Sequence, residues 1–180
     1  KEKKVIKIVI IILLLLAVGT VFALKFVAPT IKYNKAVEFA ASGDYGTAYI
    51  AFSELGRFKD AAYLKQEAGL SAAEQCLKQK EYDKANTFVN ELLKTEEVKA
   101  LQDQINLELA HEFYDAGNYA KAFKTYTAIR NYDKKSEFFY DLCYKYGRVL
   151  LNRGEHTAAI NYLKIGGNKH KVHALINEAM

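Results

Sequence analysis

The stretch GDYGTAYIAF, from Gly43 to Phe52, carries the pattern that decides the fold of this chain. Four of its positions recur at a constant interval of 37 residues, with no insertion between copies. The recurring sets are Gly43, Lys80, Gly117 and Gly154; Tyr45, Tyr82, Tyr119 and His156; Ala48, Ala85, Ala122 and Ala159; and Phe52, Val89, Tyr126 and Leu163. A period of roughly 20 to 50 residues is typical of stacked units, none of which can bury its apolar face alone. Such a body presents surface rather than an enclosed pocket, so the pattern favours recognition over catalysis.

Each repeat is predicted to contain two helices joined by a tight turn. In the first copy the helices cover residues 31–41 and 45–55, because apolar residues recur there with helical spacing. Gly43 suits a turn with positive φ, and Asp44 suits the cap of the next helix. Longer first helices are expected at 60–79, 97–116 and 134–153, and shorter second helices at 82–93, 119–130 and 156–163. Residues 171–180 match only the start of another long helix. The prediction is an all-α chain without strands.

A separate apolar segment precedes the repeats. Residues 8–24 form a run of 17 residues without a charge, bracketed by Lys7 and Lys25. A helix needs about 20 residues to cross the hydrocarbon layer, and both lysines can reach the headgroups. We therefore predict a transmembrane helix that contacts the membrane through residues 5–28. A cleaved signal peptide is the rival interpretation, but bulky neighbours crowd the candidate cleavage residues Ala23 and Ala28, which favours an uncleaved anchor.

Lysines flank this segment on both sides and set its expected orientation. They are Lys1, Lys3, Lys4 and Lys7 before the span and Lys25, Lys32 and Lys35 after it. This small bias predicts a cytoplasmic N-terminus and extracytoplasmic repeats in a single-pass protein of the cell membrane. Gly19 and Ala23 form a small-x-x-x-small pair, which permits a homodimer through the membrane helix.

Pro29 is the only proline and is predicted to end the membrane helix, since proline cannot continue helical hydrogen bonding. The predicted domains are therefore residues 1–29, a basic flank and transmembrane helix, and residues 30–180, a helical-repeat domain with about four repeats.

The net charge of +5 belongs mostly to the membrane flanks. Five lysines and one glutamate precede Pro29, whereas 21 basic and 20 acidic residues follow from there onward. The repeats thus have no overall field that would attract nucleic acid, which argues against a DNA or RNA partner.

The sequence contains no sign of catalytic or metal chemistry. It has no glycine-rich phosphate loop, no nucleophile elbow and no His–Glu–His metal helix, so we expect no enzymatic activity, no cofactor and no metal site. Cys76 and Cys143 are expected to be buried thiols too far apart for a disulfide. His170 and His173 share a helical face, but lysines beside them would repel a cation.

The half-motif Gly43-Asp44-Tyr45-x-x-Ala48-x-x-x-Phe52 and its copies resemble the tetratricopeptide repeat. The resemblance covers about residues 31–175 and implies a right-handed helical solenoid in which small residues let paired helices approach. Ala36, Ala73, Ala110 and Gly147 match the family's small position on the first helix, and Phe39, Cys76, Phe113 and Leu150 match its large apolar one. The departures are a longer period than the usual ~34 residues and the absence of the family's tryptophan and closing proline. The Phe58-Lys59-Asp60-Ala61 boundary is similar to a divergent variant found in bacterial membrane-anchored proteins.

The resemblance also implies a peptide-binding face on the first helices. Carried over by position, this face includes Asn34, Ser71, Glu74, Lys78, Glu108, His111, Lys145, Arg148 and Asn152. Lys145 and Arg148 could pair with an acidic ligand group, although a solvated helix face explains the same charges. The lysine-and-asparagine clamp that some members use for a C-terminal carboxylate is not reproduced. Tyr140 and Tyr146 lie off the apolar stripe of their helix, where they either anchor a partner or pack within the repeats.

We therefore expect a membrane-anchored scaffold that binds a protein or peptide partner at the membrane surface, an architecture similar to ancillary factors of bacterial secretion or envelope assembly. The alternative is a structural subunit packed permanently into a larger membrane or envelope assembly. A subunit should expose a contiguous apolar patch well above about 600 Å², whereas a transient binder should expose a polar groove.

Overall fold

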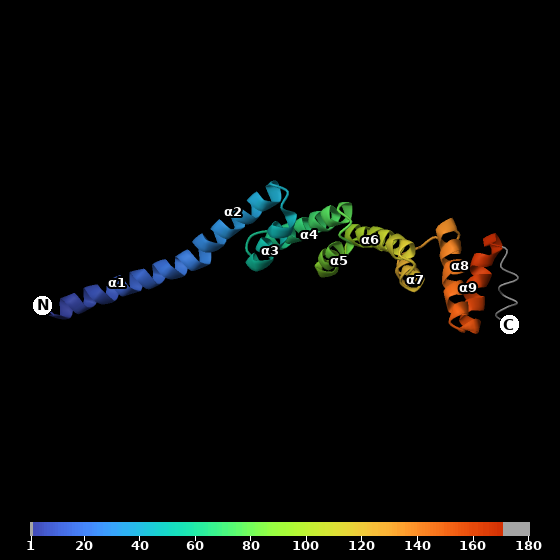
Figure 1. Ribbon diagram of the computed structural model, residues 1–180. Helices are drawn as coiled ribbons and strands as arrows, with labels where there is room; N and C mark the ends of the chain where they lie inside the picture. The colour runs from blue at the N-terminus through green and yellow to red at the C-terminus, as the bar shows by residue number, and fades with distance from the viewer. Residues whose placement is uncertain (1, 171–180) are drawn as a thin grey trace. The chain divides into compact units, whose positions relative to one another are not determined.

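The computed structural model describes residues 2–170, with side chains described for residues 6–167, and all regular structure in this range is helical (Figure 1). The prediction of an all-α chain is confirmed for these residues. The elements are α1 (Glu2–Phe22), the π-helical segment η1 (Ala23–Val27), α2 (Ala28–Ala41), α3 (Tyr45–Leu55), α4 (Ala61–Lys78), α5 (Tyr82–Glu91), α6 (Glu96–Asp115), α7 (Tyr119–Thr127), α8 (Glu137–Asn152) and α9 (His156–His170).

These elements divide into two compact units. The first contains Lys1–Gln79 with Thr87–Leu93, and the second contains Lys80–Asn86 with Lys94–Met180. Helix α5 contributes its first residues to the second unit and its last residues to the first.

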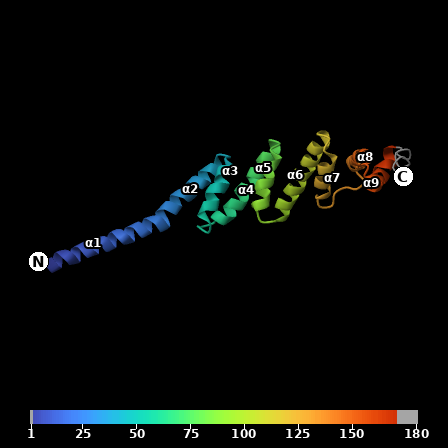
Figure 2. The same ribbon diagram turned by 60° about the horizontal axis from the view of Figure 1, so that its bottom comes forward.

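In the first unit, α1, η1 and α2 follow one another as one long helix whose N-terminal part extends away from α3 and α4 (Figures 1 and 2). The segment Ile6–Ala41 is long and apolar enough to cross a membrane, and none of its most apolar stretch is buried. Leucines such as Leu15 and Leu24 are 67% and 72% exposed, which is costly in water and favourable in lipid.

The helix does not end at Pro29, contrary to the sequence prediction. Proline removes one backbone donor, and its ring clashes with the carbonyl four residues earlier, here that of Lys25. The π-helical turn of η1 stands directly before the proline, where the Ala28 N–H bonds the Ala23 carbonyl five residues back and the helix is widened. The Thr30 hydroxyl then donates to the Phe26 carbonyl at 2.6 Å. Pro29 therefore stands in the first turn of α2, a position that proline tolerates.

Small and aromatic residues form the core of the first unit. Helix α2 packs against α3, and α3 packs against α4. Ala36, Ala48 and Phe52 are buried where these helices meet. Gly69 lies so close to its neighbours that a Cβ there would come within 2.7 Å of Leu92 and 2.9 Å of Tyr49. Helix α4 thus needs glycine at this position for close packing, a role that sequence analysis did not assign.

The second unit has an aromatic core. Helix α6 packs against α7, α7 against α8, and α8 against α9. Ala110, Ala122, Tyr126, Phe139, Leu142 and Cys143 are buried together, with further aromatic rings packed around them. Helices α8 and α9 approach closely at Gly166, where a Cβ would lie 2.6 Å from the Tyr144 amide nitrogen. The close approach requires a residue without a side chain.

The predicted 37-residue register coincides with equivalent structural positions. The four alanines Ala48, Ala85, Ala122 and Ala159 are all 0% exposed. The residues four positions later are also buried: Phe52, Val89, Tyr126 and Leu163. A hydrogen bond recurs with the same period, because Gln66 Oε1 accepts from the Leu93 N–H at 3.2 Å and Asp103 Oδ1 from the Arg130 N–H at 3.0 Å. Equivalent residues therefore occupy equivalent environments within each unit.

The turns between paired helices also repeat. The residues at the predicted turn position all have positive φ: Gly43 at 83°, Lys80 at 60°, Gly117 at 74° and Gly154 at 76°. After the first turn, the Asp44 N–H bonds the Phe39 carbonyl at 3.0 Å and the Gly43 N–H bonds the Ala40 carbonyl at 3.1 Å, a Schellman motif. Asp44 then caps α3 by accepting from the Thr47 N–H, as predicted.

Apart from the continuation through Pro29, most helix boundaries agree with the prediction: α4 and α6 begin and end within one residue of the predicted 60–79 and 97–116. Helix α3 has the predicted bounds, but α7 ends at Thr127 and α8 begins only at Glu137. The delay has a local cause, since the Ser136 hydroxyl caps α8 by accepting from the Phe139 N–H. Helix α9 continues to His170, beyond the predicted end at Leu163, because Gly166 packs within the helix instead of ending it. The predicted start of another helix at 171–180 lies outside the described residues.

Replacing Lys80 with glycine should stabilise the protein. A left-handed conformation costs an L-residue roughly 1–2 kcal/mol. Glycine avoids this cost, but its larger conformational entropy in the unfolded state offsets part of the gain. We expect Lys80→Gly to gain up to about 1 kcal/mol and Gly117→Ala to lose about 1–2 kcal/mol. Thermal unfolding in detergent, followed by circular dichroism, measures both. Lys80→Ala is the control, because it removes the amine but keeps the strain; equal stabilisation by both Lys80 variants would contradict the conformational explanation.

The Tyr49 hydroxyl should contribute stability up to strongly alkaline pH. It donates to Glu91 Oε2 at 2.6 Å, and burial, followed by this bond, raises the pKa of Tyr49 to about 12. Because the folded-state pKa lies above the unfolded value of 10.0, the contribution is complete below pH 10 and is lost as pH rises through about 12. Tyr49→Phe should cost about 1–2 kcal/mol at neutral pH. Denaturant unfolding at several pH values tests this, with exposed Tyr63→Phe as control; an unchanged deficit at high pH would argue against it.

Candidate binding pocket

One face of α6 carries a row of ionisable side chains. Glu108 and His111 are three residues apart, and Glu112 and Asp115 follow them one helical turn later, so the four side chains line a single face. Glu108 and His111 are two of the residues that the sequence predicts for partner binding. Their carboxylate and imidazole groups are exposed to solvent. The face therefore has the chemistry and the accessibility of a recognition surface.

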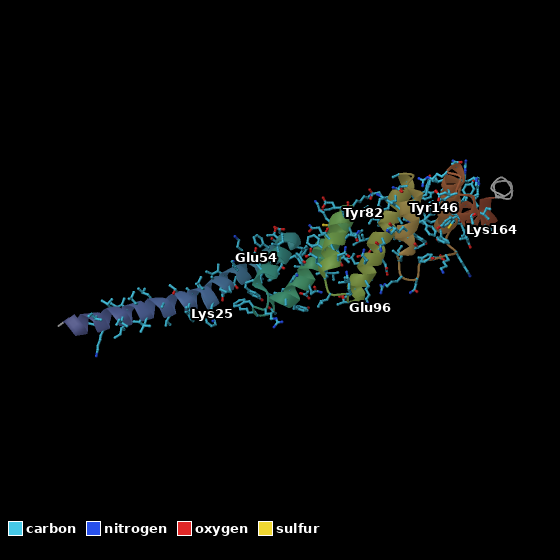
Figure 3. All side chains as sticks on the ribbon, turned by 90° about the horizontal axis from the view of Figure 1, so that it is seen from below. Lys25, Glu54, Tyr82, Glu96, Tyr146 and Lys164 are labelled. Carbon is cyan, nitrogen blue, oxygen red and sulfur yellow. The ribbon has the colours of Figure 1, made fainter. Side chains whose placement is uncertain are left out.

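This face forms a pocket with the turn before α5 and the first residue of α5. The pocket has a volume of about 320 Å³ and is lined by Lys80, Tyr82, Glu108, His111, Glu112 and Asp115; it is called the Tyr82 pocket below. Figure 3 marks Tyr82 at the start of α5. An adjoining hollow of about 290 Å³ shares Lys80, Tyr82 and Glu112 and adds the apolar Leu109 and Phe113 together with the charged Glu81, Asp83 and Lys84. Polar groups thus surround an aromatic ring, with apolar surface next to it.

The Tyr82 pocket has an excess of negative charge. Three carboxylates face one lysine, and within residues 6–167 none of Glu108, Glu112 and Asp115 forms an ion pair. Burial raises the pKa of Tyr82, and the charges of Glu108 and Glu112 raise it further. The phenol therefore stays protonated at neutral pH and can donate a hydrogen bond. This arrangement suits a cationic group with an apolar stem.

Lys80 reaches the pocket from a backbone conformation that favours glycine. The equivalent turns in the other copies have glycine, which adopts positive φ at no steric cost. Lys80 adopts φ 60° although it has a side chain. A strained residue that lines a pocket is consistent with a functional role for its side chain. Here the ammonium group can balance one carboxylate or contact an anionic group of a ligand.

His111 also connects α6 to α8. Its ring centroid lies 4.0 Å from that of Phe138, which also packs against Tyr114 at 5.3 Å. The Tyr114 hydroxyl in turn donates to Asp141 on α8. These contacts fix the side of α6 that carries the pocket, so the site is supported by the core of the second unit.

Two of the nine predicted site residues, Glu108 and His111, line the Tyr82 pocket. All nine lie on first helices as predicted, and most are exposed. Asn34, Ser71, Glu74 and Lys78 belong to α2 and α4 of the first unit, where they line none of the pockets described. On α8, Arg148 lies over the Tyr144 ring at 5.9 Å, while Lys145 is half-buried. The binding role of the full set stays a prediction.

The sequence does not indicate the pocket role of Lys80, Tyr82 and Glu112. The predicted roles of Tyr82 in repeat packing and of Lys80 in the turn are confirmed, because Tyr82 is only 9% exposed and Lys80 has positive φ. Two signals were present: Lys80 replaces a glycine of the repeat, and Glu112 follows Glu108 by one helical turn. Neither signal reveals that the turn before α5 faces α6.

The other candidate residues Tyr146, Cys76 and Cys143 pack inside the protein. Tyr146 packs between Phe123 at 5.8 Å and Tyr162 at 4.8 Å, which favours internal packing over a role as partner anchor. Cys76 and Cys143 are buried thiols, and burial raises the pKa of Cys143 to about 12, so it carries no reactive thiolate at neutral pH. The described residues contain no group of three or more side chains suited to a metal ion. The pair His170 and His173 falls outside the residues whose side chains are described.

Comparisons with family models, with curated proteins and with solved structures found no match for this chain.

Proposed function

We propose that this chain is a membrane-anchored scaffold of tetratricopeptide-like repeats that binds a protein or peptide partner through the Tyr82 pocket. The observation that carries the proposal is the set of three carboxylates without ion pairs around the ring and hydroxyl of Tyr82. The role is one of binding rather than catalysis.

The repeat assignment is supported by periodic burial and periodic hydrogen bonding. Alanines 37 residues apart are buried where helices meet, and the bonds from Gln66 to Leu93 and from Asp103 to Arg130 repeat with the same period. Small residues at helix contacts are what a right-handed solenoid of paired helices requires. In such proteins the first helices present a continuous face, to which α6 contributes Glu108 and His111.

The pocket chemistry favours a lysine or arginine side chain of the partner. An ammonium or guanidinium group can pair with Glu108 or Glu112, while its methylene stem lies against the Tyr82 ring. The adjoining hollow, with Leu109 and Phe113, can accept a neighbouring apolar side chain. The volume of about 320 Å³ suits one side chain rather than a folded domain.

The membrane anchor is the apolar part of the helix Ile6–Ala41, up to residue 28, and the flanking lysines favour a cytoplasmic N-terminus with extracytoplasmic repeats. Gly19 has open space around it and lies four residues before Ala23, so the span can also accept a second copy of itself.

Neutralising the pocket should weaken partner capture. We expect Glu108→Gln/Glu112→Gln to lower the recovery of cross-linked partners from intact membranes about tenfold or more, because a charge-assisted bond contributes about 1.5–3 kcal/mol. Quantitative mass spectrometry of the cross-linked products measures this. The control, Glu38→Gln/Glu97→Gln, removes the same charge elsewhere and should retain the wild-type pattern. Equal loss of partner recovery in both variants would refute the pocket as the binding site. Recovery of a single partner at fixed stoichiometry, unchanged in both variants, would favour the alternative of a structural subunit.

The orientation can be tested with engineered cysteines, since both native cysteines are buried. An impermeant maleimide added to intact cells should label Ser53→Cys on α3, whose side chain is exposed, and should spare Lys7→Cys until the membrane is opened. Both should resist extraction at alkaline pH. The reverse labelling pattern would mean that the repeats are cytoplasmic, and release into the soluble fraction would exclude the anchor.

A further inference from the structure

A second cavity lies in the first unit, where the long N-terminal helix meets the end of α3. It has a volume of about 610 Å³ and is lined by Leu24, Ala28, Pro29, Lys32, Glu54, Leu55, Arg57 and Phe58; it is called the collar pocket below. The lining nearest the apolar segment consists of Leu24, Ala28 and Pro29. The two cationic residues are Lys32, eight residues after Leu24 on the helix, and Arg57, in the loop after α3. Figure 3 marks Lys25 on the helix beside Leu24, and Glu54 on α3.

The position of the collar pocket along the helix matches the edge of a bilayer. The predicted membrane contact covers residues 5–28, so the edge of the hydrocarbon layer lies between Leu24, the last residue of the uncharged segment 8–24, and Ala28 when the long helix spans the bilayer. Lys32 lies about 6–12 Å beyond this edge, at about 1.5 Å per residue. The headgroup layer is roughly 5–8 Å thick on each side, and a lysine side chain can bend back into it. The apolar and cationic parts of the pocket therefore face acyl chains and phosphates respectively.

The wall of the pocket is held in place by the loop after α3. Gly56 and Lys59 both have positive φ, 57° and 50°, which turns the loop back toward α2. The Phe58 ring packs edge-on against Tyr33 of α2 at 6.1 Å, and the Lys59 ammonium stands 4.3 Å from the Tyr33 ring centroid. The Tyr33 hydroxyl also donates to Asp60 at 2.6 Å. The loop is thus fixed to the helix at three points, which positions Arg57.

The charges around the pocket are complementary to an anionic headgroup. Arg57 forms no ion pair within residues 6–167, and Lys32 pairs only with Glu54, at 3.4 Å and with both side chains more than 60% exposed. Such an exposed ion pair contributes little to stability, so a phosphate group can replace Glu54 as the partner of Lys32. The corresponding turns of the next two repeats have Lys94-Thr95-Glu96 and Asn131-Tyr132-Asp133, so the Arg57-Phe58-Lys59 sequence is peculiar to the turn beside the apolar helix.

We propose that the collar pocket binds one anionic glycerophospholipid of the membrane that α1 spans. Arg57 and Lys32 contact the phosphodiester, while Leu24, Ala28 and Pro29 contact the glycerol and the first acyl carbons. The lipid would then fix the depth and tilt of the long helix. The proposal rests on the membrane span but is independent of partner binding at the Tyr82 pocket.

The test uses the full chain in nanodiscs of phosphatidylcholine or of an equimolar mixture with phosphatidylglycerol. Spin-labelled analogues of each lipid report the immobilised fraction by electron paramagnetic resonance. We expect the wild-type chain to prefer the anionic label about fivefold for each cation that contacts it. Lys32→Gln/Arg57→Gln should lose most of this preference, whereas Lys25→Gln/Lys35→Gln, which removes two nearby charges outside the pocket, should keep most of it. Equal loss in the two variants would leave only general surface attraction and would overturn the proposal.

Two single variants separate a built site from charge alone. Ala28→Phe fills the apolar part without changing any charge and should abolish the immobilised fraction, while Glu54→Gln removes the competing carboxylate and should increase it. Absence of either effect contradicts the proposed geometry. Added inorganic phosphate should not displace the labelled lipid, and displacement would identify a soluble phosphate site instead. Failure of the chain to enter nanodiscs would refute the membrane span. Entry without a preference for the anionic lipid would refute only the collar pocket as a lipid site.

Discussion

The structure depends on close contact between paired helices at positions that have almost no side chain. Ala48, Ala85, Ala122 and Ala159 are completely buried, one in each copy of the repeat. At Gly166 even one added carbon would lie 2.6 Å from the backbone of α8. Because the helices meet at these small residues, the larger apolar and aromatic side chains fill the space on either side of each contact. Any larger residue at these points would separate the helices and open the core.

The same constraint decides which residues are left for recognition. In α6, Ala110 is buried against the next helix, and a helix turns by about 100° per residue. Glu108 and Glu112, two residues to either side, therefore point away from Ala110 and toward the turn that holds Lys80. The packing of the second unit thus places acidic side chains around Tyr82 without a dedicated loop. A helical-repeat body can in this way create a charged pocket from residues that sequence alone would assign to a solvated face.

The apolar N-terminal helix, which is long enough to cross a membrane, continues into the first repeat through a local change of helical geometry. Proline usually interrupts a helix, and the π-helical turn from Ala23 to Val27 lets this one continue into α2. Continuity carries the apolar segment directly into the first repeat and brings Leu24 and Ala28 beside Arg57 of the loop after α3. The position of the collar pocket along the long helix follows from this continuity.

The sequence by itself determined the all-helical class, the bounds of α3, the left-handed turn positions and the buried small residues, because these depend on local backbone preference and a strict period. It also indicated the apolar segment that precedes the repeats. The tertiary structure alone decided how Pro29 is accommodated, where α8 begins and why α9 continues past Leu163. It alone placed Lys80 and Tyr82 opposite Glu108, and Arg57 opposite Leu24. The physical reason is that pockets arise from residues distant in sequence, whose approach depends on how closely the helices pack.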